Sequence, residues 1–140
     1  VKTMKGVAME KYHAMEHRYP SKIEIIDKFG YDPKQISHLY RIHWFIQNYT
    51  EGQLYENCLI PSEEYSKTLV DIKKGELFTL EVAKKEGKNV LNKITNIADK
   101  FCEDNPPKSD ENIEFLLNLV LQSIIRIYLK GEFKDGNNSY

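Results

Sequence analysis

Apolar residues recur every three or four positions along most of the chain, a spacing that is typical of amphipathic helices. The pattern predicts helices over residues 1–18, 22–29, 33–51, 63–73, 80–102 and 111–130. Residues 53–60 lack this spacing, and we expect them to be extended or irregular with their apolar side chains turned inward (Leu54, Cys58, Leu59 and Ile60). The predicted fold is an all-α bundle of five or six helices with a short extended segment near residues 53–60.

Capping residues mark where several of these helices begin. Asp32 can accept hydrogen bonds from the first turn of the helix that follows it, and Pro33 suits the first helical position. Ser62 and Thr79 are expected to cap the helices after them in the same way. Gly131 is expected to end the last helix.

The length of 140 residues fits one domain with a real core. We expect a single helical domain over residues 1–131 and a flexible tail over residues 132–140. The chain starts at Val1, inside sequence with helical spacing, so we also expect it to be the C-terminal part of a larger protein. With 20 basic and 21 acidic residues the chain has no overall positive charge, so any polyanion binding must be local.

Cys58 and Cys102 lie far apart in the chain and lack metal-ligand spacing, which favours reduced thiols in a cytoplasmic protein. The most apolar run, from Ile113 to Leu129, contains Asn118 and Arg126 and is too short and too polar to span a membrane. It is expected to be central in the core or half buried by a partner, which makes it a candidate homodimer interface.

His13, Glu16 and His17 spell H-x-x-E-H, an order used by zinc peptidases in which two histidines hold the metal and glutamate activates water. The alternative is an exposed helix face that happens to carry two histidines.

Lys34, His38 and Arg41 share one face of the helix that starts at Pro33. At about 100° per residue they fall within about 60° of each other, opposite the apolar residues of the same helix. Arginine offers a planar fork for phosphate, lysine a mobile charge, and histidine a donor that titrates near neutral pH. These three residues therefore predict a site for an extended anion, against the alternative of a solvated helix face.

Motifs for complete catalysis are missing from the sequence. It contains no G-x-G-x-x-G, no phosphate-binding G-x-x-x-x-G-K-[ST] and no G-x-S-x-G. Paired aspartates after a Gly-Ser turn, which would hold magnesium, are absent as well.

The order G-Y-D-x-K-x-x-x-H-x-x-R from Gly30 to Arg41, followed by I-K-K-G-E from Ile72 to Glu76, resembles the C-terminal helical region of predicted nucleotidyltransferases of the DNA polymerase β superfamily. That branch occurs in bacteria and phages and is associated with RNA repair. The resemblance covers residues 2–101. It implies an N-terminal catalytic domain that carries the metal-binding carboxylates, with Mg²⁺ and a nucleoside triphosphate bound by the parent protein and no cofactor held by this chain alone.

The resemblance also implies roles for individual residues. Lys34, His38 and Arg41, together with Lys73, would face a triphosphate, and Tyr31, Asp32 and Gly75 would support them. No residue of this chain would be catalytic, and RNA would be a further candidate partner. The leading hypothesis is therefore a nucleotide-facing helical domain of a nucleotidyltransferase, the second is a non-catalytic interaction or dimerisation module, and the third is a zinc hydrolase.

Overall fold

The computed structural model describes residues 1–106 and 111–137. By its contacts the chain divides into two compact units, residues 1–105 and residues 106–140. Each unit is considered by itself, so one domain over residues 1–131 stays a prediction. The described residues are helical without any strand, which confirms the all-α prediction.

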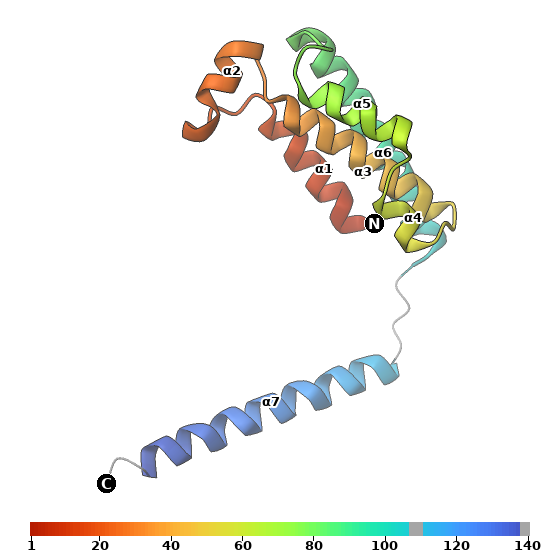
Figure 1. Ribbon diagram of the computed structural model, residues 1–140. Coiled ribbons are helices and arrows are strands. Elements are labelled where there is room, and N and C mark those ends of the chain that lie inside the picture. Colours follow the sequence, from red (N-terminus) through yellow and green to blue (C-terminus); the bar gives the residue numbers. More distant parts are fainter. Residues whose placement is uncertain (107–110, 138–140) are drawn as a thin grey trace. The chain divides into compact units, whose positions relative to one another are not determined.

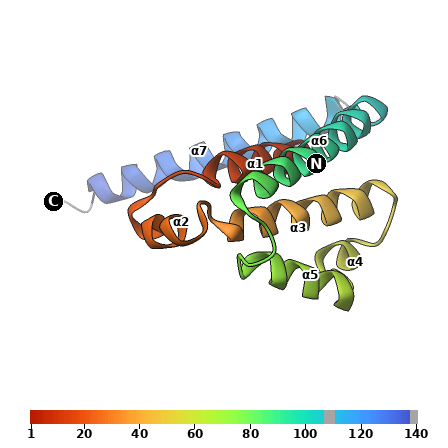
Figure 2. The same ribbon diagram turned by 90° about the horizontal axis from the view of Figure 1, so that it is seen from above.

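The first unit contains six α-helices and one short 3-10 helix. Their bounds are α1 Lys2–Ala14, the 3-10 helix Pro20–Lys22, α2 Ile23–Phe29, α3 Pro33–Thr50, α4 Tyr55–Leu59, α5 Glu63–Lys73 and α6 Leu80–Asp104. Helix α3 contacts α1, α4, α5 and α6, and α1 also contacts α6. Figure 1 shows these helices in chain order, and Figure 2 shows α1 and α6 on one side of α3 and α4 and α5 on the other.

The core of this unit is formed where α1, α3 and α6 meet. The apolar face predicted for α3 is buried there, since Ile36, Leu39 and Ile46 are fully buried. Gly87 of α6 lies at the same contact, where an added Cβ would approach Ile36 to 3.0 Å. The absence of a side chain at Gly87 therefore lets α6 approach α3 closely.

Three predicted caps are present. The Asp32 carboxylate accepts a hydrogen bond from the Lys34 backbone N–H at 3.1 Å, with Pro33 at the first helical position. The Ser62 hydroxyl accepts from the Tyr65 N–H, and the Thr79 hydroxyl accepts from the Val82 N–H. Capping signals thus located the starts of α3, α5 and α6.

The prediction of an extended segment over residues 53–60 is wrong, because residues 55–59 form α4. A helix of five residues is too short to show a helical repeat in its sequence. Only Cys58 among the four apolar residues is buried, whereas Leu54 and Ile60 are 72% and 76% exposed. Ile60 keeps the extended backbone that a following proline favours.

The second unit contains one described helix, α7 Glu111–Asn137. Gly131 does not end it, so the prediction of a helix stop there is wrong. A single glycine costs only about 1 kcal/mol relative to alanine inside a helix, and the lysine and glutamate beside it are good helix formers. The helix therefore covers most of the predicted tail, and residues 138–140 lie outside the described part of the chain.

The described residues include no helix with the length and apolar content needed to cross a membrane. The predicted cytoplasmic location stays a prediction.

Candidate anion site on helix α3

The polar face of α3 is placed as its spacing predicts. Lys34 and Arg41 are exposed, and His38 is half buried between them. Asp32 caps the start of α3. It is 2% exposed and accepts hydrogen bonds from the Lys34 backbone N–H and from the Gln35 side-chain amide. Lys22 adds an ion pair to Asp32 at 3.4 Å. Asp32 therefore fixes the helix that carries the three residues.

Tyr31 and Gly75 act at the same end of α3. The Tyr31 side chain is fully buried and its hydroxyl donates to the Phe78 carbonyl at 3.0 Å. Gly75 has a φ of +80°, and a Cβ there would come within 2.8 Å of Phe29 and Pro33. These contacts tie the segment after α5 to the start of α3, and the supporting role of Tyr31, Asp32 and Gly75 at a nucleotide stays a prediction.

His38 lies among cations from two helices. Burial lowers its pKa first, and the charges of Lys11, Lys34 and Arg41 lower that pKa further, while Asp32 acts in the opposite direction. Within the first unit, neither Lys11, Lys34 nor Arg41 forms an ion pair. The three cations around His38 therefore form no ion pair with a carboxylate of the first unit.

A hollow between α3 and α5 brings three of the predicted site residues together. His38 and Arg41 from α3 and Lys73 from α5 line a cavity of about 320 Å³, together with Ser37 and Ser66. Lys73 also makes no ion pair within the first unit. Lys34 does not line this hollow, although its charge reaches His38. The cavity, called the basic hollow below, could hold an anion between two helices.

Lys11 is a site residue that the sequence did not indicate. It lies on α1, which runs beside α3, and its charge is the largest electrostatic contribution to the lowered pKa of His38. Helical spacing identifies residues that share one helix, whereas the approach of Lys11 depends on how two helices pack.

The zinc hypothesis does not fit the observed helix. Helix α1 ends at Ala14, so His13 and His17 do not share one helical face. Glu16 forms an ion pair with Lys84 at 2.9 Å, and the His17 ring packs on the Tyr19 ring. Among the described residues no group of three or more histidine, cysteine, aspartate or glutamate side chains could hold a metal ion.

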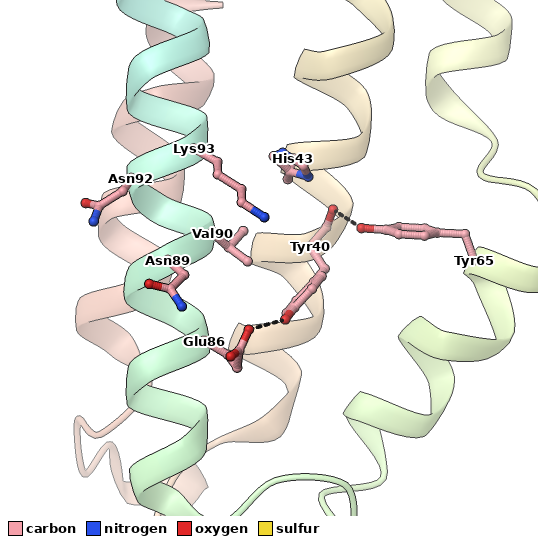
Figure 3. Close-up of a pocket in the computed structure, with 8 residues that line it drawn as sticks. All are labelled: Tyr40, His43, Tyr65, Glu86, Asn89, Val90, Asn92 and Lys93. Carbon is pink, nitrogen blue, oxygen red and sulfur yellow. Dashed lines mark hydrogen bonds between the residues drawn. The ribbon is translucent and has the colours of Figure 1, made fainter.

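A second cavity, of about 380 Å³, lies against another side of α3, between α3, α5 and α6. Figure 3 shows that Lys93 points from α6 toward α3, where His43 lies. The Tyr40 hydroxyl donates to Glu86 at 3.4 Å, and the Tyr65 hydroxyl donates to the Tyr40 carbonyl at 2.9 Å (Figure 3). We call this the balanced cavity, because it contains a carboxylate as well as a lysine.

Burial and the neighbouring Glu86 carboxylate raise the pKa of Tyr40 to about 12. Burial and the charge of Lys93 lower the pKa of His43. Near neutral pH the cavity is thus lined by two neutral tyrosines and a neutral histidine, together with one lysine and one glutamate side chain. The sequence did not indicate this cavity, because its hydrogen-bonded residues Tyr40 and Glu86 are 46 residues apart in the chain.

Comparisons with known protein families, with curated proteins and with solved structures find no match for this chain. The resemblance to nucleotidyltransferases therefore rests on the residue order from Gly30 to Glu76 alone.

Proposed function

We propose that the first unit is the phosphate-facing helical part of a nucleotidyltransferase-like protein and binds the phosphates of a nucleotide in the basic hollow. The observation that carries this proposal is the shared lining of one cavity by His38, Arg41 and Lys73. These residues come from two separate stretches of the sequence, and the resemblance singled out all three of them.

The charges in the hollow suit this ligand. Arg41 can donate two parallel hydrogen bonds to phosphate oxygens, and Lys73 supplies a point charge from the facing helix. Because none of these cations is paired within the first unit, an arriving phosphate need not displace a carboxylate. The role is binding and positioning, while Mg²⁺ and catalytic carboxylates would come from another part of the parent protein.

Isothermal titration of the 140-residue chain with inorganic triphosphate at low ionic strength tests the proposal. We expect Arg41→Ala to weaken binding by about tenfold or more, the usual consequence of losing a hydrogen bond to a charged group. Lys73→Ala should weaken it less, and Lys34→Ala least, because Lys34 lies outside the hollow. Lys93→Ala is the matched control, since it removes a lysine from the balanced cavity.

Binding by Arg41→Ala that equals that of the wild type, or no binding by the wild type at millimolar triphosphate, would overturn the proposal. A tenfold loss in Lys93→Ala would place the anion on the wrong side of α3 and would overturn it as well.

The second candidate function is self-association of two copies through α7. Within this unit the large apolar side chains of α7 are exposed around the helix: Ile113, Phe115, Leu116, Leu117, Leu119, Val120, Leu121, Ile124, Ile125, Ile127, Tyr128 and Leu129. The charges suit a second copy in antiparallel order. Glu114 and Arg126 are equally far in sequence from Val120, so in an antiparallel pair centred on Val120 each would meet its opposite charge on the partner.

Light scattering across a range of protein concentrations tests this candidate. We expect a dimer that Leu117→Glu converts to a monomer, with Leu77→Glu, at an exposed leucine of the first unit, as the control. Arg126→Glu should weaken the dimer, and Glu114→Arg added to it should restore it. A monomer at all concentrations would exclude this function.

A further inference from the structure

A second hollow adjoins the basic hollow along α3. It has a volume of about 400 Å³ and lies between α1, α3 and α4. His38 and Arg41 line both hollows. A ligand held by these two side chains would therefore have its anionic end beside Lys73 and the rest of its structure within reach of the second hollow.

The lining of the second hollow is mainly apolar and partly aromatic. Phe45 and Tyr55 meet edge to face, with ring centroids 5.8 Å apart and an interplanar angle of 84°. Met4 and Leu59 belong to the apolar wall, and Lys11 lines the hollow beside His38 and Arg41. The Tyr55 side chain is 59% exposed, so its ring can accept a planar partner without disturbing the core.

We propose that this second hollow takes the heteroaromatic base of the nucleotide whose phosphates occupy the basic hollow. The proposal rests on the proposed function, because it uses the same bound nucleotide. Aromatic side chains stack on any base, and a nearby arginine adds a favourable cation–π contact. A phosphate that carries an alkyl chain offers an anionic end and an apolar part too, but it would not gain from stacking on Tyr55.

The test compares three probes on the full 140-residue chain: ATP, inorganic triphosphate and octyl phosphate. We expect ATP to bind about tenfold more tightly than triphosphate, as one base stacked on an aromatic ring contributes. Tyr55→Ser should remove this difference and leave triphosphate binding unchanged. Tyr19→Ser is the matched control, because Tyr19 is 49% exposed and precedes the 3-10 helix, outside the lining of the second hollow. Circular dichroism confirms that each variant is folded.

The outcomes separate the two proposals. Equal affinity for ATP and triphosphate, or a Tyr55→Ser variant that keeps the full preference for ATP, would overturn the base site and leave the phosphate site standing. Octyl phosphate that competes with ATP and binds as tightly would identify an alkyl-chain site and would also overturn it. If neither ATP nor triphosphate binds, the phosphate site itself has failed and the base site fails with it.

Discussion

Two cavities lie against different sides of α3, each lined by a histidine of α3 and a lysine of another helix, and they differ in charge balance more than in volume. The basic hollow and the balanced cavity measure about 320 and 380 Å³. At about 100° per residue, His38 and His43 point about 140° apart around the helix axis. In each place burial is the main cause of the lowered pKa of the histidine.

The difference lies in what surrounds each histidine. Around His43 the cation Lys93 shares its cavity with the Glu86 carboxylate, and Tyr40 and Tyr65 use their hydroxyl groups in hydrogen bonds within the unit. Around His38 three cations gather, and the one carboxylate that acts on it, Asp32, is engaged in capping α3. Excess charge without a partner, rather than cavity volume, distinguishes the candidate anion site.

The largest expected effect comes from giving the basic hollow a carboxylate of its own. Lys73→Glu exchanges a positive for a negative charge in the lining that it shares with His38 and Arg41, and we expect it to weaken triphosphate binding by about 100-fold, near the upper end of what a lost charged hydrogen bond contributes. The measurement is isothermal titration at low ionic strength.

Glu86→Gln is the control for this change, because it alters a carboxylate only in the balanced cavity. Measured at about 0.15 M salt, where the Debye length is about 8 Å, the triphosphate affinity of Glu86→Gln should stay within about twofold of the wild type, because charges farther apart than this length are largely screened. An equal loss of triphosphate affinity in both variants would mean that binding depends on the charge of the balanced cavity as much as on that of the basic hollow.

The next effect concerns stability, and it tests how the basic hollow is held together. Gly75→Ala places a Cβ within 2.8 Å of Phe29 and Pro33 at a φ of +80°, so we expect the free energy of unfolding to fall by about 2–4 kcal/mol. Gly52→Ala is the matched control, because Gly52 has a φ of +85° but open space around it. It should cost about 1 kcal/mol, the strain of that backbone alone.

Urea unfolding of both variants measures the difference. If Gly75→Ala costs no more than Gly52→Ala, the close contact between the end of α5 and the start of α3 does not hold Lys73 in place.

A smaller effect is expected from pH. His38 faces Lys11 from α1 and Lys34, Arg41 and Asp32 on α3, and Lys73 from α5 lines the same hollow. Lysine, arginine and carboxylate groups ordinarily keep their charge between pH 5 and 8, whereas the lowered pKa leaves His38 neutral near pH 7. Lowering the pH protonates His38, so affinity for sulfate, whose own charge is constant in this range, should rise several-fold.

His38→Asn should bind sulfate with the same affinity at pH 5.5 and pH 7.5. The stability of the anion-free chain should change in the opposite direction. Because the folded pKa of His38 lies below its ordinary value of 6.5, the unfolded state binds more protons in that interval, and the melting temperature should fall as the pH is lowered below 6.5. A wild-type affinity that does not vary with pH would exclude His38 from the site.

The sequence predicted those features that depend on a few neighbouring residues. Asp32 and Pro33 located the start of α3, and the spacing of His38 and Arg41 placed them on one face. It did not predict where α1 ends, because the Met15 carbonyl there accepts a hydrogen bond from the Asp32 N–H, which is remote in sequence. The sequence also did not predict neighbours on other helices, such as Lys11 beside His38, because these too depend on contacts between remote residues.

The smallest effect concerns the hydrogen bonds that make the second cavity balanced. Tyr65→Phe removes a 2.9 Å hydrogen bond to the Tyr40 carbonyl in a half-buried place, and we expect it to lower the free energy of unfolding by about 1 kcal/mol. Tyr40→Phe removes a longer bond of 3.4 Å to Glu86, which stays solvated, so it should cost about half as much. Neither change should alter triphosphate binding, since both hydroxyl groups lie in the balanced cavity. A change in triphosphate affinity of more than about threefold in Tyr40→Phe would show that the two sides of α3 are coupled through the helix, and the contrast between them would then not be one of local charge.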